Sequence, residues 1–325
     1  MFSNRFKCTL VCAGVLLIGL VFCGGCQEQA SGSGASPDPA PSAADKPIGV
    51  DANRAYEDVK KMVEMGPRPS GSAALKKTQQ FIETELSSYG LTPTEDRFDG
   101  DTPHGKIPMM NIIARVPGSK PDIVLITGHY DTAPLPAFVG ANDGGSSAAS
   151  VLEIARVLAK TKPEYTLWFV FFDGEEAVVD WDANNRLDNT YGSRHLLAKL
   201  AADGTVKQVR AMILVDMIGD KALDIRKDAN STPWLVDIIW DTAQKYGAGG
   251  HFLGNLIDMD DDHTPFRHAG IPVVDVIDFN YGPDNDYWHT AQDTLDKISG
   301  ESIKTVSDVV IGALGEVYAH LNSGP

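Results

Sequence analysis

Cysteine is scarce in this chain of 325 residues, and none occurs after residue 26. The four cysteines, at positions 8, 12, 23 and 26, all lie near the N-terminus. From Gln27 onward the chain can therefore form neither a disulfide nor a thiolate metal site. Any metal ion bound there has to be held by Asp, Glu and His side chains.

Positive charge is also in short supply. The chain has 28 Lys and Arg residues against 44 Asp and Glu residues, which gives a formal net charge of −16 at pH 7. Binding to nucleic acid depends on cationic side chains that neutralise phosphates, so the composition argues against nucleic acid as a partner. With 43% hydrophobic residues, the chain has enough apolar side chains for one large domain.

Residues 1–26 have the features of an export signal. A positive start, an apolar core, two small residues and a cysteine follow one another: Arg5 and Lys7, Thr9 to Phe22, Gly24 and Gly25, and Cys26. This order resembles a bacterial lipoprotein signal, which implies an exported protein of the cell envelope that is anchored to the membrane by a lipid on Cys26. Cys23 stands where such signals usually have leucine. An uncleaved signal that anchors the protein, and a secreted protein, therefore stay open as alternatives.

Residues 27–47 consist mainly of Ser, Gly, Ala and Pro. Such a segment cannot bury enough apolar surface to fold, so it is predicted to be a disordered tether. The rest of the chain, residues 48–325, shows no repeat and no internal boundary, and is predicted to be one catalytic domain.

Apolar segments with the periodicity of strands alternate with segments of helical periodicity along this domain. Strands are predicted near Thr92 to Phe98, Met110 to Val116, Ile123 to Thr127, Leu167 to Phe172, Val209 to Val215 and Pro272 to Ile277. Helices are predicted from Asp51 to Met65, Ser72 to Tyr89, the loop 140–147 to Lys160, Tyr191 to Leu200, Thr232 to Tyr246 and Ile303 to Leu321. The alternation indicates an α/β domain with a largely parallel central sheet.

Two adjacent carboxylates, Glu175 and Glu176, follow the most apolar of these strands. Ligands of open α/β sheets gather at the carboxyl ends of the strands. Two neighbouring glutamates repel each other and are costly to desolvate unless a cation or a proton separates their roles. An isolated Glu-Glu pair is more often a solvated turn, so the functional interpretation depends on the other residues near it.

Similar side chains follow several of the predicted strands and loops. They are His129, Asp131, Asp143, Glu175, Glu176, Asp216, Asp261 and His289. Each alone has a structural explanation, such as a helix cap or a hydrogen-bonded histidine, but their recurrence at one end of the sheet favours a metal centre. Imidazole and carboxylate ligands around an open position suit zinc acting as a Lewis acid. The glycine-rich loop 140–147 lacks the Gly-Lys-Ser/Thr ending of a phosphate-binding loop and contains an acid, which argues against an anionic ligand.

This set of residues resembles the zinc-dependent aminopeptidase superfamily and, within it, the glutaminyl cyclases, over residues 50 to 321. The superfamily resemblance depends on His129-Tyr130-Asp131, the loop 140–147, Glu175-Glu176, Asp216-Met217-Ile218-Gly219 and His289. The cyclase resemblance depends on Phe172 to Ala177 followed by Trp181 and by Tyr191 to Leu196, on Asp261 to Phe266 before Gly270 to Val273, and on Trp288 before His289. It implies a three-layer α/β/α sandwich with a mixed, mostly parallel sheet.

The resemblance also implies a role for each site residue. A single zinc ion would be held by Asp143, Glu176 and His289, with Glu175 as general acid/base, Asp216 and Asp261 as hydrogen-bonded acids beside it, and Trp181 and Trp288 as walls of the substrate pocket.

His129 and Asp131 match positions that ligate or orient a second metal ion in two-metal peptidases. His129 and Asp216 are therefore candidates for a second site. The chain departs from the animal cyclases because it has no cysteine pair near His129 and because Asp275 stands where histidine is common. One zinc ion is favoured, and two stay open.

The activity implied by the resemblance is the conversion of the N-terminal glutamine of peptides or proteins to pyroglutamate, with release of ammonia. The alternative is a two-zinc aminopeptidase that hydrolyses N-terminal residues. A non-catalytic surface-binding domain is disfavoured because every expected acid and histidine is present.

Overall fold

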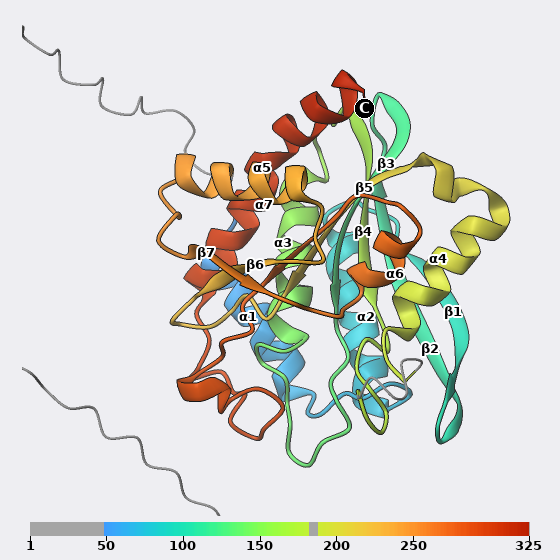
Figure 1. The fold of residues 1–325 in the computed structure, drawn as a ribbon. Coiled ribbons are helices and arrows are strands. Elements are labelled where there is room, and N and C mark those ends of the chain that lie inside the picture. Colours follow the sequence, from blue (N-terminus) through green and yellow to red (C-terminus); the bar gives the residue numbers. More distant parts are fainter. Residues whose placement is uncertain (1–48, 182–187, 325) are drawn as a thin grey trace, which may run out of the picture. The chain divides into compact units, whose positions relative to one another are not determined.

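A mixed sheet of eight strands forms the centre of the computed structural model, which describes residues 49–181 and 188–324 (Figure 1). The predicted signal at residues 1–26, the lipidation at Cys26 and the tether at residues 27–47 lie outside the described residues. Within the described ranges, no helix combines the length and the apolar character that crossing a bilayer requires.

The strands are β1 (Thr94–Thr102), β2 (Gly105–Val116), β3 (Lys120–His129), β4 (Tyr165–Phe172), β5 (Val209–Asp216), β6 (Ile225–Asp228), β7 (Phe252–Ile257) and β8 (Val273–Ile277). Their order across the sheet is β1-β2-β4-β3-β5-β8-β6-β7. The four inner strands β4, β3, β5 and β8 are mutually parallel, whereas β1 and β2 form an antiparallel hairpin and β6 runs antiparallel to β8. The inner strands therefore end at one common edge.

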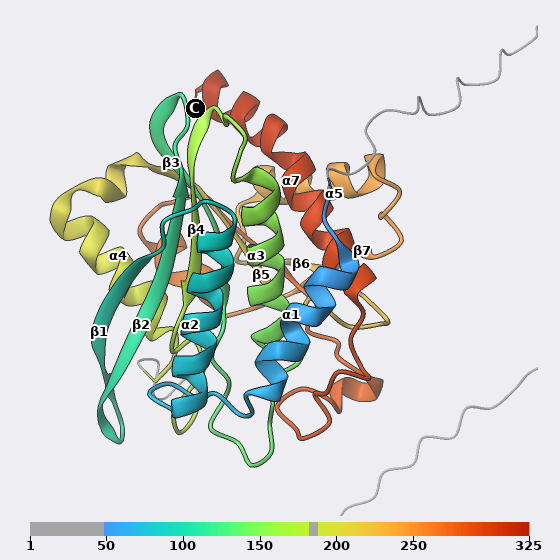
Figure 2. The ribbon, with the colours of Figure 1, turned by 180° about the vertical axis from the view of Figure 1, so that it is seen from behind.

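Helices cover both faces of this sheet (Figures 1 and 2). They are α1 (Ala52–Glu64), α2 (Ala73–Ser88), α3 (Gly145–Leu158), α4 (Tyr191–Asp203), α5 (Pro233–Lys245), α6 (His263–His268) and α7 (Gly300–Ser323), with short 3₁₀ turns η2 (Thr205–Gln208) and η3 (Pro283–Asn285). One apolar cluster joins α1, α2, α3, α5 and α7 to one face of the sheet, and a second joins α4 and α6 to the other.

Alternate residues of the inner strands supply the two clusters, as the pleat of a strand requires. In β3, Val124 and Ile126 belong to the larger cluster, while Ile123 and Leu125 belong to the smaller one. A strand that is buried on both faces reads as a continuous apolar run, which explains why the inner strands were visible in the sequence. The predicted three-layer α/β/α sandwich with a mixed, mostly parallel sheet is confirmed.

Three parts of the fold differ from the sequence expectations. The β1–β2 hairpin is longer than predicted because its polar tip, residues 99–106, lacks an apolar alternation. The strands β6 and β7 were not predicted, since they are short; β7 forms the edge of the sheet and buries only Phe252, and β6 has only four residues. The short helix α6 was not predicted, because its six residues are too few to show a helical periodicity.

Candidate metal centre and its pocket

The parallel inner strands bring the predicted site residues to one edge of the sheet. His129 is the last residue of β3 and Asp216 the last of β5, and Glu175 and Glu176 follow the end of β4. Because β3 lies between β4 and β5, His129 is paired in register with Phe172, at the end of β4. His129 is thus placed between the glutamate pair and Asp216.

The first group of candidate ligands consists of Asp143, Glu176 and His289. Their ligand atoms lie within 4.8 Å of one another. The His289 Nε2 atom lies 3.3 Å from Asp143 Oδ2 and 3.2 Å from Glu176 Oε2. Both carboxylates are buried, while the His289 side chain is 24% exposed.

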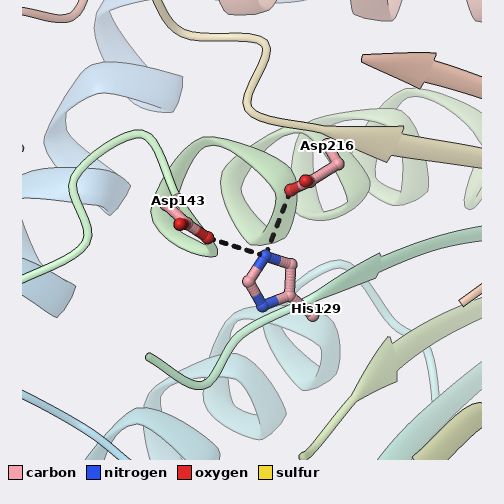
Figure 3. Close-up of side chains that lie close together, drawn as sticks. All are labelled: His129, Asp143 and Asp216. Atoms are coloured by element: carbon pink, nitrogen blue, oxygen red, sulfur yellow. Dashed lines mark hydrogen bonds and ion pairs between the residues drawn. The ribbon is translucent and has the colours of Figure 1, made fainter. Parts of the chain in front are cut away.

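The second group consists of His129, Asp143 and Asp216, shown in Figure 3. The His129 Nε2 atom lies 3.3 Å from Asp143 Oδ1 and 3.1 Å from Asp216 Oδ1. Asp143 is therefore shared by the two groups and offers one oxygen to each histidine. All three side chains of this group are buried.

The turn after β4 is built to point the glutamates at these groups. Gly174 has φ +71°, a left-handed conformation that favours glycine, and a Cβ atom there would also lie 2.7 Å from Met109 Sδ. The buried Asp131 carboxylate accepts hydrogen bonds from the backbone N–H groups of Glu175 and Glu176, at 3.2 and 3.4 Å. Asp131 therefore orients the glutamate pair through its backbone.

The loop that carries Asp143 is held from two sides. The Arg68 guanidinium is fully buried and donates to the carbonyls of Tyr130, Val139 and Gly140. On the other side, the Asp293 carboxylate accepts hydrogen bonds from the backbone N–H of Asp143 at 3.0 Å and of its preceding residue at 2.8 Å. These contacts fix the backbone of the loop, and with it the direction of the Asp143 side chain.

Two residues at the site, His289 and Met217, have a left-handed backbone conformation. His289 has φ +54°, and Met217, directly after Asp216, has φ +49°. Left-handed backbone is uncommon for residues other than glycine and is tolerated where the surrounding structure imposes it, as at functional sites. The ring of His289 is held between Trp288, stacked at 4.1 Å, and the edge of Phe138, at 5.6 Å.

Buried acids outnumber the cationic side chains near the site and dominate its electrostatics. Burial and, after it, the charge of the nearby Asp143 raise the pKa of Glu176 to about 7. Burial also raises the pKa of Glu175 well above its usual range, against the charge of His129, and the acids Asp261 and Glu176 add to the effect. For Asp261, burial and the charge of Asp216 raise the pKa in the same direction. Such a concentration of buried carboxylates is expected where a cation binds or where a carboxyl group carries a proton.

A cavity of about 320 Å³ opens onto this centre. Its wall combines aromatic and apolar side chains, among them Trp181, Met217, Ile277, Phe279 and Trp288, with acids of both the centre and the rim. Asp143, Glu175, Glu176, Asp216, Asp261 and His289 all contribute to its lining. A pocket with mostly apolar walls and a few convergent polar groups is typical of a ligand site. A second cavity of about 480 Å³, between α2 and the β1–β2 hairpin, is lined by none of the predicted site residues.

The structure thus brings together every residue predicted for the site, although it does not test their roles. His129 is beside the centre but does not line the cavity. Sequence reasoning missed Arg68, Asp293 and Ser147, whose hydroxyl donates to Asp216 Oδ1 at 2.8 Å. Nothing in the sequence marks Arg68 or Asp293 as a partner of the loop that carries Asp143.

The chain matches Peptidase family M28 over residues 111–314. A crystal structure of an Acidobacteriales bacterium glutaminyl cyclase is similar at 39% identity with a TM-score of 0.80, covering 88% of this chain and all of that one. Glutaminyl-peptide cyclotransferase of Bos taurus is 29% identical over 80% of each chain. A protein described as a leucine aminopeptidase precursor from Bacteroides thetaiotaomicron is similar at 26% identity with a TM-score of 0.75, covering 83% of this chain and 98% of that one.

Proposed function

The chain belongs to Peptidase family M28 and, within it, to the glutaminyl cyclases, and on this premise we propose that it converts N-terminal glutamine of peptides to pyroglutamate with the help of one zinc ion. The observation that carries the proposal is the convergence of Asp143, Glu176 and His289 at a pocket that Trp181 and Trp288 line, with Glu175 beside the group but outside it.

The donor set of the first group fits a zinc ion. Two carboxylates and an imidazole are typical ligands of catalytic zinc, and such sites leave one position open for substrate. The buried Asp143 Oδ2 atom lies 3.3 Å from His289 Nε2, so the two candidate ligand atoms face each other, as expected of side chains that share one ion. When bound, zinc would polarise the side-chain amide carbonyl of the substrate and stabilise negative charge on its oxygen.

In the reaction, the α-amine of the substrate attacks the carbon of its own side-chain amide. A C–N bond closes the five-membered ring, the bond to the amide nitrogen breaks, and ammonia leaves. Glu175 would take the proton that the amine loses and deliver one to the departing ammonia, because its raised pKa lets one carboxyl group do both. The charge of Asp261 would help to keep the pKa of Glu175 high, and Asp216 would act on Asp261 in the same way.

Ring closure also needs the amine and the amide to lie close together. An extended glutamine side chain has several rotatable bonds, and fixing them in the reactive arrangement can supply a large part of the rate. Trp181 and Trp288 line the cavity next to the candidate ligands, so we propose that they hold the glutamine side chain folded over the centre.

The test is incubation of the purified protein with a glutamine-initiated peptide, followed by mass spectrometry and an ammonia assay. Pyroglutamyl peptide with equimolar ammonia supports the proposal. Release of free glutamine would instead support a two-zinc aminopeptidase, the alternative for which all the ligand types are present and whose fold is shared. The chain's higher identity to a glutaminyl cyclase favours ring closure.

We also propose that the protein is exported and anchored in the cell envelope by a lipid on Cys26. The support is the order of charged, apolar and small residues before that cysteine. Expression of the full chain and of its C26S variant in bacteria tests this: the parent should partition into detergent and carry a lipid-modified N-terminal cysteine, and the variant should do neither.

A further inference from the structure

The mouth of the cavity carries two exposed carboxylates that the proposed chemistry does not use. Asp258 and Asp260 both line the cavity, and both are exposed. They lie in the loop between β7 and α6, directly before Asp261 (Figure 1). Among the described residues, no Lys or Arg side chain lines the cavity and no ion pair neutralises either carboxylate.

The backbone of this loop is held in place before any ligand arrives. The Asn230 amide donates to Asp258 Oδ1 at 2.5 Å and to the Met259 carbonyl at 2.8 Å. The Met259 N–H donates to the buried Asp228 carboxylate at 3.1 Å. The Arg267 guanidinium donates to the side-chain amide oxygen of Asn230 at 3.0 Å, and within the described residues no hydrogen bond or ion pair joins Arg267 to Asp258. A charged group on a fixed loop gives more specificity than one on a mobile chain, because less entropy is lost on binding.

When the N-terminal glutamine of a peptide lies in the cavity, the rest of the peptide extends out through this mouth. The second and third residues of the peptide then lie next to the loop that carries Asp258 and Asp260. A cationic side chain there would meet two carboxylates and the thioether of Met259, which lies between them in sequence and also lines the cavity. An acidic side chain would meet the same carboxylates as like charges, with the acids of the centre behind them.

We propose that Asp258 and Asp260 form a subsite for a positively charged side chain at the second or third residue of the substrate. The enzyme then prefers glutamine-initiated peptides with Lys or Arg at these positions over those with Asp or Glu. This inference rests on the proposed function. Because the subsite is remote from the reacting atoms, it contributes equally to ground and transition states, and the preference appears in KM and not in kcat.

The test compares peptides that differ only in the residue after glutamine, namely Lys, Ala or Glu, and a second set that varies the third residue. Exposed charge pairs are individually weak, so the expected preference for Lys over Glu in kcat/KM is about tenfold at low ionic strength, falling toward unity at high salt. The D258N/D260N double variant should lose most of this preference while it keeps kcat for the Ala peptide.

The matched control is D101N/D241N, which changes the net charge by the same amount at two exposed acids outside the cavity lining. It should keep the full preference. Equal loss of preference in both double variants would show that net charge alone steers the peptides, and would overturn the subsite.

Equal kcat/KM for all peptides in the parent would also overturn it, as would a preference that survives in D258N/D260N. The single variant D260N separates a loss of charge from a disturbed fold, since Asp260 makes no hydrogen bond or ion pair with the described residues. D260N should lose part of the preference for Lys over Glu. If no glutamine-initiated peptide is cyclised at all, the proposed function fails, which is a different result from cyclisation without charge preference.

Discussion

The two histidine–carboxylate groups that share Asp143 use the same kinds of ligand but differ in access. His289 is 24% exposed and lines the cavity, whereas His129 is 1% exposed and lies behind it. The nitrogens of His129 are also surrounded by carboxylates of the protein itself: in addition to Asp143 and Asp216, Asp131 and Glu175 lie 3.5 and 3.6 Å from Nδ1.

The difference shows that a set of ligand types is not enough to identify a catalytic ion. A catalytic metal needs a position open to substrate. All three members of the His289 group line the cavity, whereas in the other group Asp143 and Asp216 line it but His129 does not. At His129, burial lowers the pKa, but the charges of Glu175 and Asp216 outweigh burial and raise it well above its usual range. A protonated His129 can therefore balance the acids around it, and on this basis we propose one zinc ion.

We call Asp143, Glu176 and His289 the open group, and His129, Asp143 and Asp216 the closed group. The largest effect is expected from His289→Ala, which removes the imidazole of the open group. The variant should lose its bound metal and fall to background turnover, because the several kcal/mol that a Lewis acid supplies are lost with the ion. Metal content by mass spectrometry of metals, alongside the glutamine-peptide assay, measures both. A variant that keeps stoichiometric zinc would exclude the His289 group as the catalytic site.

Glu175→Gln should leave the metal bound yet reduce kcat about 10²- to 10⁴-fold, the usual contribution of general acid–base catalysis. The glutamine side chain keeps the size of Glu175 but cannot accept the proton of the substrate amine. Unchanged turnover with full metal content would remove Glu175 from the mechanism.

His129→Ala tests the closed group directly. With a single ion at the open group, the parent should bind one zinc per chain and the variant should still bind one. Turnover should decrease by about 10- to 100-fold, as is usual when a supporting partner of a metal site is removed. A parent with two ions, one of which is lost in the variant, would instead make the closed group a metal site.

The smallest effect concerns Asp58 on α1, a carboxylate buried away from both groups. It pairs with Lys61 at 3.1 Å, and burial raises its pKa to about 6. A carboxyl group whose pKa is higher in the folded than in the unfolded state stabilises the fold at low pH, and this stabilisation is lost as the pH rises from about 4 to about 6.

Asp58→Asn should therefore raise the free energy of unfolding by about 1–2 kcal/mol at pH 7.5, after allowance for the lost Lys61 pair, and by almost nothing at pH 4. Urea unfolding at the two pH values measures this, with and without added zinc. The increase in the free energy of unfolding should be the same with and without zinc, because Asp58 belongs to neither group of candidate ligands. An increase that depends on zinc would show that Asp58 is coupled to the metal centre.

Much of the sheet could be predicted because strands buried on both faces are continuous apolar runs. Leu167 to Phe172 and Val209 to Val215 match β4 and β5 closely. The helix predicted from Ser72 is α2, and the Ser72 hydroxyl caps its first turn by accepting a hydrogen bond from the Leu75 N–H at 3.0 Å. The strands β6 and β7 were not predicted because β6 has only four residues and β7, at the edge of the sheet, buries only one side chain, so neither leaves a clear pattern in the sequence.

The sequence by itself determined which acids and histidines follow the strands, since the apolar runs and the turn residues after them are local properties of the chain. Only the tertiary structure decided which histidine faces the cavity. That choice depends on the place of β3 between β4 and β5, which buries His129, and on the loop before α7, which turns His289 outward with a positive φ. Contacts of this kind join residues more than 100 positions apart, such as Glu176 and His289, and no local pattern encodes them.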